Sequence, residues 1–319
     1  MKKVLKTIFL LILIIVIVAI ATIAIFFKSK LNKINYENIG RADIEINEGV
    51  EEDLSNYTNI ALLGLDAKDN TFANSRSDCI MIISINDNTK DVNIVSVYRD
   101  TYLQIDGHGL DKVTHAYAYG RAPLAISTIN KNLDLDIVEY VTINFDSVIK
   151  IVDAIGGVDI EVTDQEATQI PGIYSAGTYT LNGTQALAYG RIRKIDSDYA
   201  RTERMRNVVI KVFDKIKGMS YTKLNNLIDE LLPEVSTNIT QNKIISYTSK
   251  ISQYKVKNSF GWPYDVQGYS TTIWYAAPVT LESNVKKLHL DLFGTSNYQV
   301  SNTVKDINDS IISKTGYNN

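Results

Sequence analysis

Two aspartates and an arginine lie beside two apolar runs that have the composition of buried strands. Asp66 follows the run at residues 59–65, while Arg76 and Asp78 precede the run at residues 79–85, and a polar loop joins the two runs. Mg²⁺ takes oxygen ligands, usually one or two carboxylates, with substrate phosphates and water completing the shell. The spacing therefore predicts a site for a cation beside an anionic group. Strand-end aspartates also cap helices and stabilise turns, which is the structural alternative.

Arginines dominate a second candidate region, residues 190–206. Six cations face three acids there, so this segment carries a formal charge of +3 and the rest of the chain −6. A helix predicted to begin near Tyr199, with Asp198 as its N-cap, places Arg201 and Arg204 in or near the first turn, where the helix dipole normally favours acids. A bound anion would remove that mismatch, because N–H groups and guanidinium groups would converge on it. A solvated helix start with Glu203 compensating is the alternative.

Six arginines in the chain fall at the ends of predicted elements or in loops. Arginine is favoured over lysine where a phosphate is held in a planar, bidentate manner. Together with two metal-binding aspartates, several such arginines predict a diphosphate ligand. The set is Arg76, Arg99, Arg191, Arg193, Arg201 and Arg204. Arg191 and Arg193 taken alone also fit the C-terminus of a preceding helix, where the dipole favours cations.

Other chemistries find little support in the sequence. His108, His115 and His289 are the only histidines, and no serine or cysteine lies in a nucleophile motif. Neither a Walker loop nor a dinucleotide-binding glycine motif occurs, which argues against nucleotide use. The formal net charge of −3 at pH 7 argues against nucleic acid as a partner, since such binding rests on a basic surface.

Strands and helices are predicted to alternate along the chain, which favours one α/β domain at residues 57–293. We expect a three-layer α-β-α fold with a central mixed sheet and both aspartates at strand ends, where ligands bind in such sheets. Residues 28–56 are predicted to be a linker, and the Asn- and Ser-rich residues 294–319 a frayed polar tail. The strands are expected at 59–65, 79–85, 92–98, 137–143 and 158–162, and helices at 123–133, 146–155 and 199–216.

The N-terminal segment has the pattern of a membrane-spanning helix. Residues 7–27 carry no charge and are flanked by three lysines on each side. A run of roughly 20 apolar residues is enough to cross a bilayer core as a helix. We therefore expect a single-pass anchor in the cell membrane, preceded by a short cytoplasmic stub at residues 1–6. A cleaved signal peptide is the alternative, although its apolar region normally runs for only about 7–15 residues.

Five ordered groups of motifs resemble the LytR-CpsA-Psr family of membrane-anchored cell-wall proteins. They are LLGLDAKD with SRSDCIMIISIN, VSVYRDT, DKVTHAYAYG, DAIGGVD, and LNGTQALAYGRIR with DSDYARTERMRN. The resemblance covers about residues 59–216, in the order typical of the family. Five positions depart from the usual pattern. Tyr98 stands where the family usually has Pro, Val113-Thr114 replaces Ile-Asn, Arg121 replaces a Gly, and Met205 replaces a Gln.

The resemblance implies an extracytoplasmic domain that moves a phosphoglycan, of teichoic acid or capsule type, from a polyprenyl-diphosphate carrier to a peptidoglycan hydroxyl. Carried over by position, Asp66 and Asp78 would hold Mg²⁺, and Asp78, Arg99 and Arg201 are the predicted catalytic residues. The lipid tail would lie in an apolar tunnel whose lining the sequence does not assign. The arginines that would bind the diphosphate are Arg76, Arg99, Arg191, Arg193 and Arg201, with Arg204 nearby.

Two other functions stay open at the level of the sequence. One is a non-catalytic anchored regulator that binds lipid-linked polymer, although a cytoplasmic stub of residues 1–6 is too small for a signalling domain. The other is a polyprenyl-diphosphate phosphatase, which would use the same site with water as the acceptor. The general base is also unassigned, because Asp66 or Asp78 could accept the proton but a metal ligand is a compromised base.

Overall fold

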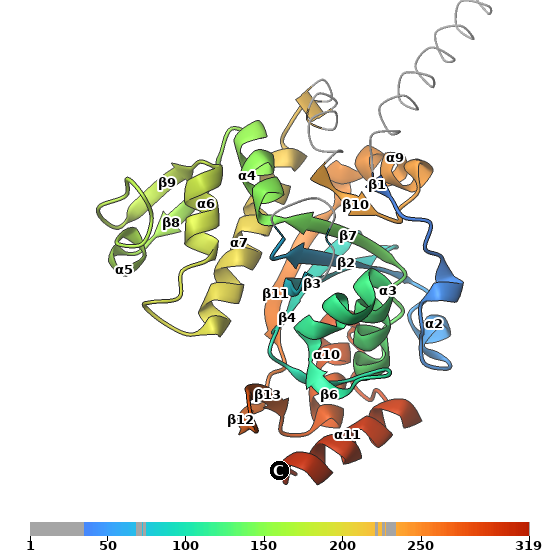
Figure 1. The fold of residues 1–319 in the computed structure, drawn as a ribbon. Helices are drawn as coiled ribbons and strands as arrows, with labels where there is room; N and C mark the ends of the chain where they lie inside the picture. The colour runs from blue at the N-terminus through green and yellow to red at the C-terminus, as the bar shows by residue number, and fades with distance from the viewer. Residues whose placement is uncertain are drawn as a thin grey trace, which may run out of the picture.

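A seven-stranded sheet forms the centre of the computed structural model, which describes residues 35–67, 72, 75–220, 223–224, 227 and 234–318 (Figure 1). In order across the sheet, the strands are β1 (Asn35–Tyr36), β10 (Ser236–Thr237), β7 (Glu139–Asn144), β2 (Tyr57–Leu65), β3 (Ser77–Asn86), β4 (Asp91–Val97) and β11 (Lys255–Trp262). β2 is antiparallel to β3 and parallel to β7, while β4 is antiparallel to β3 and parallel to β11. The predicted central mixed sheet is confirmed.

Helices cover both faces of this sheet because its central strands are apolar on both sides. Along β2, Ala61 and Leu63 pack in one core cluster, and Ile60 packs in another on the opposite face. The first face is covered by α3 (Val113–Leu133), α10 (Leu281–Phe293) and α11 (Asn302–Thr315). The second face is covered by α4 (Phe145–Ala154), α7 (Asp198–Lys217) and α9 (Gln241–Ser249).

A smaller unit packs beside α7 and has an apolar core of its own (Figure 1). It contains the hairpin of β8 (Val158–Val162) and β9 (Gly177–Leu181), together with α5 (Asp164–Ala167) and α6 (Gly183–Gly190). Gly183 lets α6 begin directly against α4, since a Cβ at this position would lie 2.3 Å from the carbonyl oxygen of Ile149. Val208 of α7 joins the same core, so α7 connects this unit to the sheet.

The remaining described elements are short and lie at the margins of the sheet. They are η1 (Arg41–Asp43), α2 (Val50–Asp53), β5 (Tyr102–Ile105), β6 (Gly109–Lys112), η3 (Ile251–Gln253), β12 (Val266–Ser270) and β13 (Trp274–Pro278).

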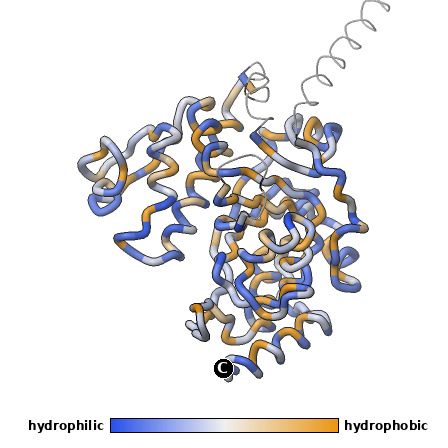
Figure 2. Tube along the Cα trace, in the orientation of Figure 1, coloured by the Kyte–Doolittle hydropathy of each residue, from blue (hydrophilic) through white to orange (hydrophobic). Residues whose placement is uncertain are grey.

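Two segments predicted to be peripheral contribute to the core. Within the expected linker, Ile44, Val50 and Leu54 are each only 2% exposed and pack in the main apolar cluster. The expected frayed tail instead contains α11, which buries Val304 and Ile311. Figure 2 shows apolar positions recurring among polar ones along α11. The polar composition was misleading because an amphipathic helix needs apolar residues on one face only.

The expected membrane anchor, residues 7–27, and the stub before it lie outside the described residues. Within residues 35–318, wherever the chain is described, no helix combines the length and the apolar character needed to cross a membrane.

Candidate functional site

Asp78 lies in a β-bulge at the start of β3. Gly64 is paired with Cys79 and Leu65 with Ser77, so Asp78 is the extra residue between them. Its backbone N–H donates to the carbonyl of Arg76 at 3.1 Å instead of to β2. Bulges of this kind redirect a side chain at the end of a strand and are common beside active sites. The predicted strand-end position of Asp78 is confirmed, and the bulge sets its direction.

Arg99 follows β4 and is surrounded by carboxylates. Its Nη1 donates to Asp78 Oδ2 at 3.0 Å, and its Nε lies 3.5 Å from Asp100 Oδ2 and 3.6 Å from Asp198 Oδ2. The side chains of Arg99 and Asp78 are 20% and 8% exposed. Burial alone would lower the pKa of Arg99, but the carboxylates outweigh it and raise the pKa above its usual value, led by Asp78. Arg99 is therefore a fixed, fully charged group.

The first turn of α7 brings a second guanidinium group to the same place. Ser197, and not the predicted Asp198, is the N-cap, because its side chain accepts from the N–H of Ala200. Asp198 accepts a hydrogen bond from Arg201 Nη2 at 2.9 Å and also lies beside Arg99. Burial lowers the pKa of Arg201; Asp198 opposes this effect, whereas the positive charges of Arg99 and Arg193 add to it. Cations thus converge at this helix start, as the sequence predicts.

The charged cluster adjoins an apolar cavity of about 180 Å³ between the sheet and helices α4 and α7. Asp78, Arg191 and Arg201 line a small recess at its mouth. Cys79 and Phe145, with Met205 of α7, line both the recess and the cavity. Val148, Val152, Val209 and Val212 line the cavity further in. An amphiphile fits this arrangement, with its charged head at the cluster and its apolar tail in the cavity.

Two side chains at the recess have unusual surroundings. The guanidinium group of Arg191 lies over the ring of Phe145, 4.5 Å from its centroid, which is a cation–π contact. Burial raises the pKa of the Cys79 thiol to about 12. Cys79 is therefore a neutral wall residue at physiological pH and not a nucleophile.

Arg204 lies on a different side of α7 from Arg201. Its Nε donates to Glu166 Oε1 at 2.7 Å, and its Nη1 donates to Asp196 Oδ1 at 3.1 Å. Glu166 in turn accepts from the N–H of Thr163 at 2.9 Å, which fixes the start of α5. The structure therefore gives Arg204 ion pairs that hold the hairpin unit to α7, and its contact with a diphosphate stays a prediction.

Asp66 and Arg76 are exposed and lie beside the cluster at the same end of the sheet. The N–H of Asp66 donates to the carbonyl of Arg76 at 3.2 Å. Both side chains, with His115 and Tyr119, line an open depression of about 400 Å³ that is separate from the recess at Asp78. Arg193 is exposed close to Arg201. The structure thus brings together Asp78, Arg99, Arg191, Arg193 and Arg201, and leaves Asp66 and Arg76 at the margin.

The chemistry of the two aspartates fits a Mg²⁺ ion that also binds substrate. In the part of the chain that the structure describes, no group of three or more His, Cys, Asp or Glu side chains could hold a metal alone. Asp66 and Asp78 follow or begin paired strands, which is compatible with an ion bound by two carboxylates and completed by phosphate oxygens and water.

Three further residues of the site, Asp100, Lys112 and Thr114, lie within the quoted motifs but receive no role there from the sequence. Asp100 forms an ion pair with Lys112, with 2.7 Å between Oδ1 and Nζ, and its other carboxylate oxygen lies beside Arg99. The Thr114 hydroxyl donates to the carbonyl of Ser77 at 3.0 Å and so holds the bulge. Their place inside the motifs VSVYRDT and DKVTHAYAYG is the signal that the sequence offers for all three.

Comparisons with known proteins agree with this geometry. The LytR_cpsA_psr family matches residues 22–287. The polyisoprenyl-teichoic acid–peptidoglycan teichoic acid transferase TagU of Bacillus cereus is 35% identical over 237 residues, which cover 72% of this chain and 77% of that protein. A structure of TagT bound to LI-WTA superposes with a TM-score of 0.67 at 28% identity, covering 81% of this chain and 99% of the other.

A second structure is informative because of its ligand. TagT with bound octaprenyl pyrophosphate lipid superposes with a TM-score of 0.59 at 27% identity, covering 74% of this chain and 90% of the other. The family match spans more than half of the chain, including the whole of the arginine and aspartate cluster. The chain therefore belongs to the LytR-CpsA-Psr family.

Proposed function

We propose that this protein transfers a phosphoglycan of the teichoic acid type from a polyprenyl-diphosphate carrier to a hydroxyl group of peptidoglycan. The observation that carries the proposal is the junction of the Asp78–Arg99–Arg201 cluster with the apolar cavity. A lipid diphosphate is complementary to this junction, because its doubly charged head is joined to an apolar chain. The names of the relatives, which are teichoic acid transferases, support the same reading.

The reaction follows from where the charges lie. The acceptor hydroxyl loses its proton to solvent as its oxygen forms a bond to the phosphorus that carries the glycan. The bond from that phosphorus to the bridging oxygen breaks, and polyprenyl phosphate leaves. Arg99 and Arg201 neutralise the charge that grows on the leaving phosphate. Asp78 and Asp198 keep both guanidinium groups in place before substrate arrives. A Mg²⁺ ion held by Asp66 and Asp78 would add to the same charge neutralisation.

The apolar run at residues 7–27 supports a further part of the proposal, a single-pass anchor in the cell membrane with the folded domain on its outer side. Both the lipid carrier and the acceptor would then be within reach of the site.

The decisive experiment uses the full-length chain in detergent, incubated with a polyprenyl-diphosphate-linked saccharide and peptidoglycan oligomers. We expect a phosphodiester conjugate in the mass spectrum. Chelation of Mg²⁺ by EDTA should lower its rate of formation by at least about 100-fold, since a bound metal supplies several kcal/mol of charge stabilisation. An equal rate with and without EDTA would remove Mg²⁺ from the proposal.

The same assay separates the alternatives. Release of phosphosugar without a conjugate would identify a phosphatase. Tight binding of the lipid diphosphate with neither product would identify a binding protein, and the transferase would be abandoned.

Blocking the apolar cavity should weaken lipid binding. Val212 of α7 lines the cavity, so the indole of Val212→Trp should occupy space needed by the lipid. We expect the Kd for a polyprenyl diphosphate to rise at least about tenfold, since overpacking costs about 1–3 kcal/mol. The matched control is Asp214→Trp on the exposed side of the same helix. Equal affinities of the two variants, measured by fluorescence titration, would show that the tail lies elsewhere.

A further inference from the structure

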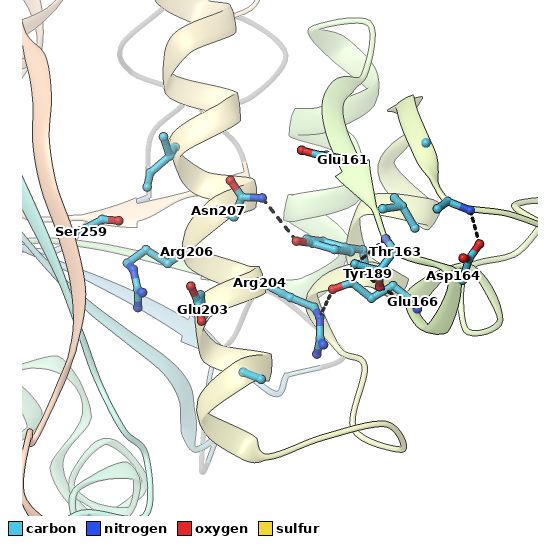
Figure 3. A pocket seen from close by; sticks show the side chains of 15 residues that line it. Glu161, Thr163, Asp164, Glu166, Tyr189, Glu203, Arg204, Arg206, Asn207 and Ser259 are labelled. Carbon is cyan, nitrogen blue, oxygen red and sulfur yellow. Dashed lines mark hydrogen bonds and ion pairs between the residues drawn. The ribbon is translucent and has the colours of Figure 1, made fainter.

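A polar groove of about 630 Å³ runs along α7 on the side away from the apolar cavity. Figure 3 shows Arg206 and Ser259 on one side of the helix and Tyr189, Glu166 and Asp164 on the other. Glu203, Arg204 and Asn207 project from the helix between them (Figure 3). We call this the α7 groove. Neither the diphosphate cluster nor the apolar cavity accounts for it.

Arg206 is a buried cation in the lining of the α7 groove. The residue is only 6% exposed, and its Nη1 donates to the hydroxyl of Ser96 at 3.1 Å. Among the residues that the structure describes, no carboxylate lies within ion-pairing distance of its guanidinium group, and Ser96 is its one hydrogen-bond partner. A guanidinium group has five N–H donors. Arg206 therefore retains N–H donors for the acceptor oxygens of a ligand, sugar hydroxyl and acetamido oxygens included.

An aromatic pair joins the α7 groove to the diphosphate cluster. The rings of Tyr98 and Tyr199 lie with their centroids 4.4 Å apart at an angle of 56°. Tyr98 precedes Arg99 in the chain, and Tyr199 follows Asp198 and is 37% exposed. The phenol of Tyr98 lies over Gly261, where a Cβ would be 2.1 Å from its oxygen. Since β11 side chains alternate, Gly261 faces the same side as Ser259 of the groove.

Tyr98 is also close to the groove residues on α7. Burial raises the pKa of Tyr98, the charge of Arg206 opposes this, and Tyr199 and Glu203 add to it. Asp78 and Arg99, the tyrosine pair and the α7 residues of the groove are therefore neighbours in the fold.

The charge of the α7 groove restricts its ligand. Its lining contains four carboxylates and two guanidinium groups, a formal charge of −2. Such a lining repels a polyphosphate chain, whereas carboxylates accept hydrogen bonds from sugar hydroxyl and N–H groups. A saccharide without phosphate supplies an apolar C–H face for the tyrosine rings, neutral acceptors for Arg206 and donors for the carboxylates.

We propose that the α7 groove and the Tyr98–Tyr199 pair bind an unphosphorylated glycan, with a sugar ring against Tyr199, and so position the acceptor strand beside Arg99. The inference rests on the proposed transferase function for the role of acceptor. Binding itself does not depend on turnover, so it can be tested separately.

The test measures ligand binding to the full-length chain in detergent by saturation-transfer NMR. The ligands are a peptidoglycan tetrasaccharide and, separately, a glycerol-phosphate oligomer, and neither carries lipid. Saturation should reach the tetrasaccharide and not the oligomer. Tyr199→Ala should raise the Kd for the tetrasaccharide at least about fivefold, whereas Tyr199→Phe should retain it, because the contact is made by the ring face. Ser259→Trp, which fills the groove at a separate point, should weaken binding as well.

Tyr36→Ala serves as the matched control, since Tyr36 is 49% exposed on β1 at the opposite edge of the sheet. Unchanged tetrasaccharide affinity in both Tyr199→Ala and Ser259→Trp would overturn the inference, as would binding of the glycerol-phosphate oligomer alone. In the conjugate assay, Tyr199→Ala should raise KM for the peptidoglycan oligomer and leave the Kd for the lipid diphosphate unchanged. Specific tetrasaccharide binding without any conjugate would support the groove as a glycan site and refute the transferase.

Discussion

Replacing Arg99 with alanine is expected to reduce the rate of phosphodiester formation by about 10³–10⁵-fold, the range found when an arginine that stabilises phosphoryl-transfer charge is removed. The guanidinium group contacts Asp78 and lies beside Asp198, so it links the bulge of β3 to the first turn of α7. Its charge is held in place before substrate binds, and this preorganisation is lost with the side chain. Single-turnover kinetics with saturating lipid diphosphate would measure the effect.

The control for this prediction is Arg99→Lys, which keeps the charge and loses the planar pair of donors. Its rate should fall between those of the wild type and the alanine variant. Because Arg99 and Asp78 are in contact, the effects of Arg99→Ala and Asp78→Ala should not add in the double variant. A rate for Arg99→Ala within tenfold of the wild type would show that the transition-state charge is stabilised elsewhere.

Arg204→Ala is expected to destabilise the fold by about 3–5 kcal/mol, the cost of removing one partner of a buried ion pair. The side chains of Arg204 and Glu166 are only 8% and 11% exposed, so the remaining carboxylate has little access to water. Thermal and urea unfolding would measure the loss. The control is Arg193→Ala, an exposed residue of the same cationic segment, for which a change within about 0.5 kcal/mol is expected.

The same ion pair predicts a pH dependence of stability. Burial raises the pKa of Glu166, but hydrogen bonds from Arg204 and Thr163 outweigh it, so the pKa lies below its usual value of 4.5. A carboxyl group with a depressed folded-state pKa contributes stability that is present above pH ~4.5 and is lost as the pH falls through the folded-state pKa. This acid-dependent loss should be smaller in Arg204→Ala. An identical slope in both proteins would contradict the assignment.

Sequence patterns predict the strands and helices whose buried positions recur regularly along the chain. β2, which ends just before Asp66, and β3, which contains Asp78, are apolar on both faces. α7 has apolar positions at helical spacing, so all three elements follow from the sequence pattern. The bulge at Asp78 is invisible in the sequence because it arises from the pairing of two strands. Its consequence, a carboxylate aimed at Arg99, therefore needed the structure.

The separate roles of the arginines are the feature that is hardest to predict from the sequence. Arg201 and Arg204 stand three residues apart, and the sequence treats them alike. In the fold, Arg201 faces the recess, while Arg204 meets Glu166, which lies 38 residues away in the chain. A contact between segments so far apart leaves no local pattern. The α7 groove is not predictable from the sequence for the same reason, because residues of β8, α7 and β11 line it together.

The packing of α11 also determines when this domain can finish folding during synthesis. Val304 and Ile311 are fully buried against a core that begins with Ile44, so the last layer comes from residues made some 260 positions later. A nascent chain that stops before residue 302 leaves that part of the core open to water. Nearly the whole domain must therefore be free to fold before its interior closes, and until then its exposed apolar surface favours aggregation.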